Sequence, residues 1–109
     1  FLSPDRLEDA FKRAKMLINE PKFIECIKGK EIYKEQPFKV KNELKQMDLF
    51  CFNEREICVI DYKTTDKNIE ENKKQVKEYK DALSKFYEKH SIIAVIFYAL
   101  EGKISYIEV

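Results

Sequence analysis

Two aspartates and a lysine, Asp48, Asp61 and Lys63, have the types and spacing that predict chemistry in this chain. Asp61 and Lys63 follow an apolar run, and residues two apart on a strand project from the same face of a sheet. Two carboxylates, completed by backbone carbonyls and water, are a usual ligand set for Mg²⁺. A lysine beside such an ion can stabilise charge on a phosphate. The three residues are therefore our candidates for a metal-dependent catalytic centre.

A hairpin would bring the two aspartates together. The segments Leu44–Phe52 and Glu56–Lys63 have the composition of strands, and a short polar connection separates them. A hairpin closed symmetrically around this connection places Asp48 opposite Asp61, with Cβ atoms roughly 4.5–5.5 Å apart. Two like charges at that separation repel, and a divalent cation between them would remove the repulsion.

The remaining segments predict the elements that must position this pair. Apolar residues recur at helical spacing over residues 4–18 and over Asn68–Lys89. Pro37 predicts an edge strand or a bulge in the extended segment that contains it. We expect an α/β fold, a mixed β-sheet flanked by helices in the order α-α-β-β-β-α-β-β. Besides the hairpin, its elements are helices over 4–18 and from Pro21 to Gly29, an extended segment Glu31–Val40, a helix Asn68–Lys89, and strands Ser91–Leu100 and Lys103–Val109.

Length and composition limit the class of protein. The chain has 109 residues, 44% hydrophobic and 38% charged, which fits one globular domain. The longest apolar stretch, Ile92–Leu100, is too short to cross a bilayer, so we expect no membrane association. The net charge of +1 gives no general basic excess for nucleic acid. Because the chain starts at Phe1 and stops within a strand-like run, we expect a domain cut from a longer polypeptide.

The cysteines favour a reducing compartment. Cys26, Cys51 and Cys58 are odd in number and widely spaced, which argues against a disulfide framework. His90 is the one histidine and cannot complete a zinc site with them. We therefore interpret the three cysteines as small buried hydrophobic residues of a cytoplasmic protein.

Several short motifs, taken in order, carry a resemblance to a known family. The run Val59-Ile60-Asp61-Tyr62-Lys63-Thr64-Thr65 resembles the "hydrophobic–hydrophobic–Asp–Tyr–Lys–Thr" motif of RecB/AddA-type nucleases, which belong to the PD-(D/E)XK superfamily. Three further matches lie around it: Glu35-Gln36-Pro37-Phe38 resembles "Glu-x-Pro-Phe", Lys45-Gln46-Met47-Asp48-Leu49 resembles the first aspartate motif, and Gln75-Val76-Lys77-Glu78-Tyr79 matches "Gln-x-x-x-Tyr".

The resemblance implies a restriction-endonuclease-like fold and a Mg²⁺-dependent exonuclease, with Mn²⁺ as an alternative ion. Such a domain hydrolyses DNA phosphodiesters during double-strand-break repair and recombination, together with a helicase domain or subunit. Its site residues would be Asp48 and Asp61 as metal ligands, the Tyr62 carbonyl as a further ligand, Lys63 as the catalytic lysine, and Gln75 and Tyr79 as residues that position DNA.

The chain departs from the family pattern at two points. Gln46 stands where the family usually has a glycine before the first aspartate, which would alter the backbone beside the metal. The upstream histidine that often serves as an additional ligand is absent, and His90 lies at the wrong end of the chain to replace it. A fragment without that histidine is expected to bind metal poorly. The alternative function is a catalytically weak or inactive nuclease-like module that binds DNA or docks a subunit.

Each assignment also has a simpler structural interpretation. Asp61 and Lys63 could form a same-face ion pair, which is common and weak at exposed positions. Tyr79 could belong to the apolar stripe of the long helix, with Gln75 at its polar margin. Three further charged residues could contact DNA or the metal's surroundings, or could simply be solvated: Lys73, Lys74 and Glu35.

Overall fold

The computed structural model describes the backbone of residues 4–40 and 43–109 and the side chains of residues 4–34 and 48–109. The predicted order of helices and strands is confirmed. The elements are α1 (Pro4–Ile18), α2 (Pro21–Ile27), β1 (Glu31–Val40), β2 (Glu43–Phe52), β3 (Glu56–Lys63), α3 (Ile69–Phe86), β4 (Ser91–Leu100) and β5 (Lys103–Glu108).

The described strands form one mixed five-stranded sheet in the order β1-β2-β3-β4-β5. All neighbours are antiparallel except β3 and β4, which are parallel and are connected through α3. A parallel pair requires such a crossover, because the chain must return to the same end of the sheet. Pro37 lies in the edge strand β1, where a missing N–H donor is tolerated.

The turn between β2 and β3 closes without glycine. The side-chain Oδ1 of Asn53 accepts hydrogen bonds from the backbone N–H groups of Arg55 (2.9 Å) and Glu56 (2.7 Å). An asparagine that satisfies the backbone two and three residues ahead can replace the usual glycine turn. This connection sets the register of the hairpin that carries the candidate site.

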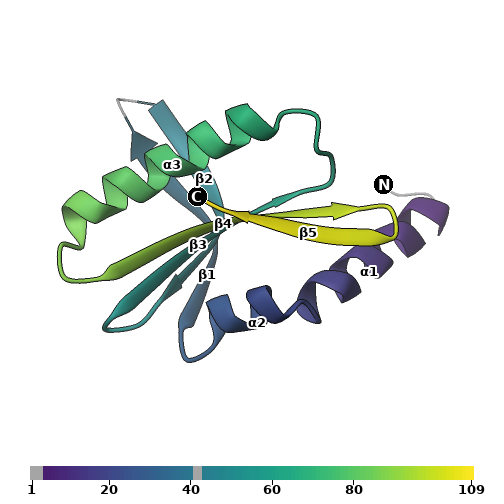
Figure 1. The fold of residues 1–109 in the computed structure, drawn as a ribbon, viewed down its shortest axis with the longest axis horizontal. Coiled ribbons are helices and arrows are strands. Elements are labelled where there is room, and N and C mark those ends of the chain that lie inside the picture. The colour runs from purple at the N-terminus through teal and green to yellow at the C-terminus, as the bar shows by residue number, and fades with distance from the viewer. Residues whose placement is uncertain (1–3, 41–42) are drawn as a thin grey trace.

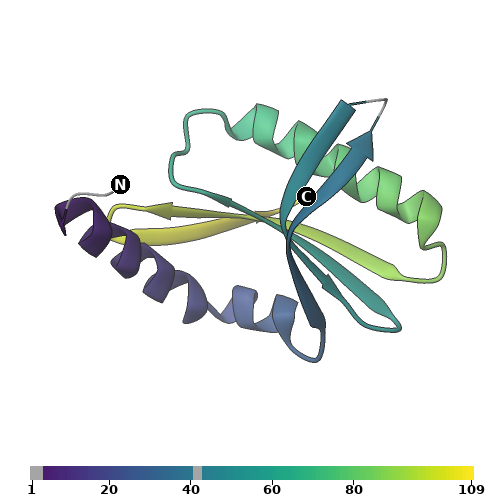
Figure 2. The same cartoon turned by 180° about the vertical axis from the view of Figure 1, so that it is seen from behind.

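Helices cover both faces of the twisted sheet. Figure 1 shows α3 on one face and α1 and α2 on the other, and Figure 2 shows the same layers from behind. Alternate residues of β3 and β4 therefore enter two separate apolar clusters. The α3 cluster contains Ile57, Val59, Val76, Tyr79, Leu83, Ala94, Ile96 and Tyr98. The α2 cluster contains Phe23, Cys26, Cys51, Cys58, Ile60, Val95 and Phe97.

The long helix ends at Phe86, three residues before the predicted end at Lys89. Tyr87 leaves the helical conformation, and its ring packs against Phe52 (5.8 Å between centroids) and His90 (5.2 Å). Tertiary packing of this aromatic residue therefore overrides the helix-favouring composition of the segment that follows. Within the described part of the chain, no helix is long and apolar enough to cross a membrane.

Candidate active site

The hairpin register brings the two predicted aspartates together. Leu49 pairs with Ile60, so the next positions along the two strands are Asp48 and Asp61. Because side chains alternate along a strand, both aspartates lie on the face that α3 covers, in line with Val59. The predicted juxtaposition of Asp48 and Asp61 is thereby confirmed, while their chemical roles remain predictions.

Asp48 is held against the backbone of the opposite strand. Its Oδ2 accepts a hydrogen bond of 2.7 Å from the backbone N–H of Tyr62, the residue between Asp61 and Lys63. The half-buried Asp48 carboxylate is therefore positioned beside the Asp-x-Lys segment by a contact independent of any ion.

Asp61 is the buried charged residue of the site, with 6% of its surface exposed. The Nζ of Lys63 lies 3.4 Å from its Oδ2, and the lysine side chain is 31% exposed. The predicted same-face ion pair is therefore present, but its acidic partner is buried rather than at the exposed position where such pairs are common. Among the described residues, Oδ2 of Asp61 has no hydrogen-bond partner. An ion pair without good hydrogen bonds compensates poorly for the burial of a carboxylate.

The surroundings of Asp61 disfavour its charged form. Burial is the main cause that raises the pKa of Asp61, from 3.8 to about 6. The ammonium of Lys63 opposes this rise, and the neighbouring Asp48 carboxylate adds to it. Two carboxylates and one amine thus leave the site short of positive charge. A cation that approached this pair would relieve both the repulsion and the desolvation.

The donor set fits a hard divalent cation in part. Two carboxylates converge, and among the described residues the buried Oδ2 of Asp61 has an ion pair with Lys63 but no hydrogen-bond donor, so an oxygen-coordinated ion could approach it. Among residues with described side chains, no three His, Cys, Asp or Glu residues group closely enough to hold a metal.

The backbone of Glu35 lies opposite Asp48, between the pairs Lys34–Leu49 and Gln36–Met47. Its side chain lies outside the described residues, so its predicted supporting role stays a prediction.

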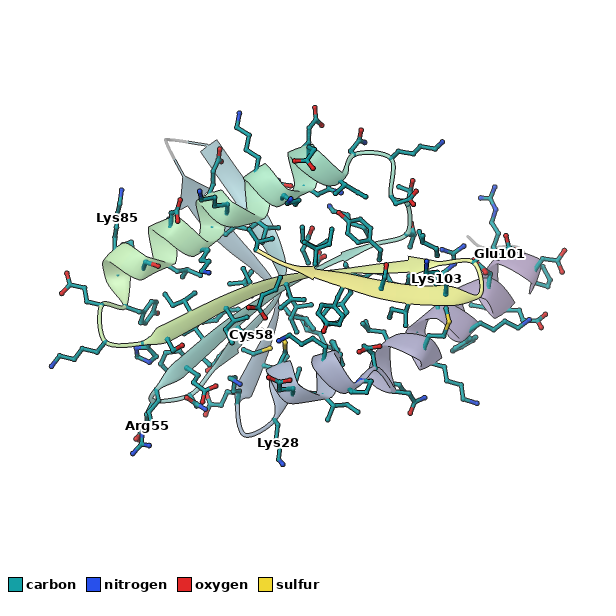
Figure 3. The ribbon with its side chains drawn as sticks, in the orientation of Figure 1. Lys28, Arg55, Cys58, Lys85, Glu101 and Lys103 are labelled. Atoms are coloured by element: carbon teal, nitrogen blue, oxygen red, sulfur yellow. The ribbon has the colours of Figure 1, made fainter. Side chains whose placement is uncertain are left out.

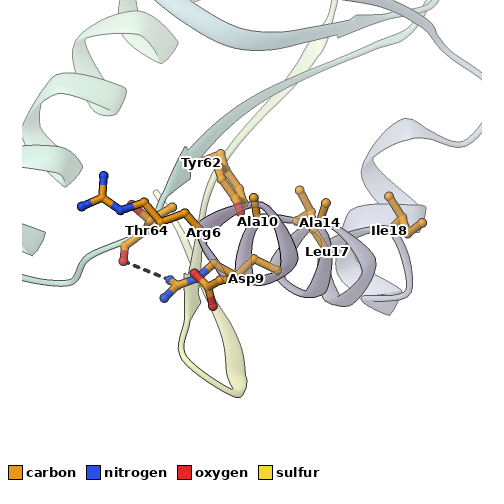
Figure 4. Close-up of a pocket in the computed structure, with 9 residues that line it drawn as sticks. Arg6, Asp9, Ala10, Ala14, Leu17, Ile18, Tyr62 and Thr64 are labelled. Carbon is orange, nitrogen blue, oxygen red and sulfur yellow. Dashed lines mark hydrogen bonds and ion pairs between the residues drawn. The ribbon is translucent and has the colours of Figure 1, made fainter. Parts of the chain in front are cut away.

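Tyr62 points to the opposite face of the sheet. Its ring borders a hollow of about 690 Å³ between α1 and the end of β3 (Figure 4). Two arginines, an aspartate and small or aliphatic residues of α1 complete the lining: Arg6, Asp9, Ala10, Arg13, Ala14, Leu17 and Ile18, with Thr64 of the segment after β3. This hollow lies across the sheet from the carboxylates and is not part of the acidic site.

The residues predicted to position DNA divide into two groups. Tyr79 is 2% exposed within the α3 cluster, as its apolar-stripe interpretation predicts. Gln75 is half-buried and lines a polar hollow on α3 together with Asn72, the exposed Lys74 and the two glutamates Glu71 and Glu78. Lys73 lies 3.8 Å from Glu70 in a surface ion pair, which favours a solvated role for it. Gln75 and Lys74 are therefore the better placed of the four for contact with a ligand.

A tyrosine and an asparagine that were not predicted border the site. Tyr98 of β4 is the register partner of Lys63 and lies on the same face of the sheet. Its hydroxyl accepts a hydrogen bond of 3.2 Å from Nδ2 of Asn72 on α3. Asn72 lies four residues before the buried Val76 on the same side of that helix, and a polar residue in this stripe was the available signal.

Arg13 of α1 binds the strand ends that carry the site. Its Nη1 donates to the carbonyl of Thr64 (3.3 Å), just after β3, and to that of Ala99 near the end of β4. Its Nε lies 2.7 Å from Oδ2 of Asp9 on the same helix. A guanidinium with several fixed donors suits this bridging role, which local sequence does not reveal.

Comparison of the chain with protein-family models, with curated proteins and with solved structures gives no significant match. The resemblance to RecB/AddA-type nucleases therefore depends on the short sequence motifs.

Proposed function

We propose that this chain is the metal-dependent nuclease domain of a RecB/AddA-like helicase-nuclease. In this proposal it hydrolyses DNA phosphodiester bonds as an exonuclease during double-strand-break repair and recombination. The observation that carries the proposal is the meeting of Asp48 and Asp61 across β2 and β3, with Lys63 3.4 Å from the buried Asp61 oxygen. A structural ion pair alone would not need a second carboxylate at this place.

The three side chains have distinct roles in the proposed reaction. Asp48 and Asp61 would hold Mg²⁺, or Mn²⁺ in its place, together with the Tyr62 carbonyl. The chemistry that such an ion supplies when bound is activation of water and neutralisation of phosphate charge. Lys63, whose side chain is partly exposed, would turn from Asp61 towards the phosphate and stabilise its developing negative charge.

The surrounding helix would hold the DNA. Lys74 and Gln75 line a polar hollow on α3, the helix that covers the same face of the sheet as the two aspartates. A lysine there could neutralise a backbone phosphate, and the amide could bind a phosphate oxygen or a base edge. Since the net charge of the chain is only +1, a helicase partner would supply most of the affinity for DNA.

The decisive experiment measures Mg²⁺-dependent degradation of linear DNA, using the full-length protein. Wild type is compared with Asp61→Asn and Lys63→Met, and with Asp81→Asn and Lys85→Met as exposed controls on α3. We expect the two site variants to lose at least about 100-fold in rate, as expected for loss of a group that stabilises the transition state. The two controls should retain the wild-type rate.

Binding of DNA, measured in parallel, separates the two candidate functions. Undiminished digestion by both site variants would overturn the catalytic assignment. Wild-type protein that binds DNA without cleaving it in Mg²⁺ or Mn²⁺ would instead support a nuclease-like binding module.

A further inference from the structure

Three thiols from three different elements lie together between α2 and the sheet. Cys26 of α2, Cys51 of β2 and Cys58 of β3 are free and are 4%, 0% and 1% exposed. Cys51 and Cys58 are direct register partners across the hairpin. Cys26 and Cys58 belong to the same buried α2 cluster, and their thiols interact. Figure 3 shows Cys58 on the side of the sheet that α2 covers.

The charges around the cluster single out Cys26. The pKa of the Cys26 thiol is lowered, chiefly by its interaction with Cys58 and then by Lys22 and Lys30, while burial and Glu25 oppose this shift. Lys30 is close by with a side chain that is only 5% exposed. Burial, by contrast, raises the pKa of Cys51 to about 11. Because the thiolate is the nucleophile in thiol chemistry, Cys26 is the member of the cluster suited to attack.

The cover over these thiols is thin. The helix α2 has seven residues, and only Phe23 and Cys26 of it are buried. Its contacts with the sheet include an edge contact between Phe23 and Phe97 (5.7 Å) and an ion pair between Lys22 and Glu108 (2.8 Å). A short element with few buried contacts opens more readily than the core, and such opening would admit a small reagent.

We propose that Cys26 and Cys58 form a redox-active thiol pair, which a low-molecular-weight disulfide oxidises to an intramolecular disulfide between α2 and β3. This inference does not depend on the proposed nuclease function, because the thiols lie on the opposite face of the sheet from Asp61. Their separation in the sequence hides the pair, and only the packing of α2 brings it together.

The reaction balances as two thiol–disulfide exchanges. The Cys26 thiolate attacks one sulfur of the small disulfide, forms a mixed disulfide and releases one small thiolate. Cys58 then attacks the Cys26 sulfur, the mixed disulfide breaks, and the second small thiolate leaves. The protons from Cys26 and Cys58 pass to the two released thiolates, so two protein thiols are oxidised and one small disulfide is reduced.

The first exchange prepares the second. The interaction with Cys26 is the main cause that raises the pKa of Cys58, ahead of burial. When Cys26 becomes a mixed disulfide it can no longer carry a thiolate charge, so this cause weakens, whereas burial continues to raise the pKa of Cys58. Lys30 also favours the charged form of Cys58. Because Cys58 lies in the same buried cluster as Cys26, it is placed to resolve the mixed disulfide.

The test incubates the folded protein with glutathione disulfide and maps the product by mass spectrometry of non-reduced peptides. We expect wild type to lose two hydrogen atoms in mass and to yield a peptide pair linked through Cys26 and Cys58. The matched variant Cys51→Ala should form the same link, and Cys26→Ala should form none. The oxidised wild type should also melt several degrees higher, because the disulfide lowers the conformational entropy of the unfolded chain.

Two results would overturn the proposal. One is a link between Cys51 and Cys58 in the wild-type peptides, since this measurement needs no variant to fold. The other is a wild-type protein that remains fully reduced at a glutathione disulfide concentration that oxidises its thiols after unfolding in urea.

Discussion

The backbone N–H of Tyr62 donates a 2.7 Å hydrogen bond to Oδ2 of Asp48, across the two strands that carry the candidate site. This bond joins a side chain of one strand to the backbone between Asp61 and Lys63 on the next. It fixes the position of Asp48 relative to both residues without requiring a ligand. The acidic pair is thus part of the folded sheet. The unfavourable free energy of bringing two carboxylates together therefore lowers the stability of the fold itself.

The pH dependence of stability should report this cost. Since the folded state raises the pKa of Asp61 from 3.8 to about 6, it binds the proton more tightly than the unfolded chain. The contribution of Asp61 to the free energy of unfolding is therefore fully present at pH values below 3.8. It is lost as the pH rises through about 6, and the loss is up to about 3 kcal/mol. We expect Asp61→Asn, measured by urea unfolding in EDTA, to stabilise the protein near neutral pH and to have little effect near pH 4. A pH-independent difference from wild type would contradict this, and Asp81→Asn is the control.

Addition of Mg²⁺ should stabilise the protein through the same carboxylates. An ion present at ten times its dissociation constant adds about 1.4 kcal/mol, or roughly 5 °C in melting temperature for a domain of this size. We expect this rise for wild type and for Asp81→Asn, and none for Asp61→Asn. Equal shifts in all three proteins, measured by thermal unfolding, would place the ion elsewhere.

The hydrogen bond between Asn72 and Tyr98 should stabilise the contact between α3 and the sheet beside Lys63. Removal of the hydroxyl in Tyr98→Phe leaves the Asn72 amide without its acceptor and should cost about 1 kcal/mol. The double variant with Asn72→Ala should cost less than the sum of the two single variants. Tyr106→Phe, at an exposed position, should change the free energy of unfolding by less than about 0.5 kcal/mol.

Arg13 should matter more to stability than its helical neighbour Lys12. Replacement by methionine keeps the aliphatic stem but removes the donors to the Thr64 and Ala99 carbonyls, at a cost of about 1–3 kcal/mol. Lys12 is 73% exposed and its ion pair with Glu8 is of the weak surface kind, so Lys12→Met should be nearly neutral. Equal free energies of unfolding for the two variants would show that Arg13 does not hold the strand ends.

The sequence predicted what depends on local pattern. The alternation of apolar and polar residues and the length of the β2–β3 connection were enough to place Asp48 opposite Asp61. The sequence did not show that the Asn53 side chain takes the place of the usual glycine in this turn. Contacts between distant segments were not predictable in this way. Nothing near Arg13 indicates the carbonyls it binds, and the spacing of Cys26 from Cys58 conceals their contact. The true end of α3 depends on the packing of Tyr87, which is also a tertiary effect.

The mixed sheet has a consequence for how the molecule folds. The antiparallel pairs β1–β2 and β2–β3 close over short connections, whereas β3 and β4 can pair only after α3 has bridged them. Closing a longer loop costs more chain entropy. We therefore expect the hairpins to be formed in the transition state for folding and the parallel pair to form after it. Mutations in the β2–β3 hairpin should then slow folding, and mutations in β4 should mainly speed unfolding. In that sequence of events the two aspartates meet early, and Tyr98 joins Lys63 last.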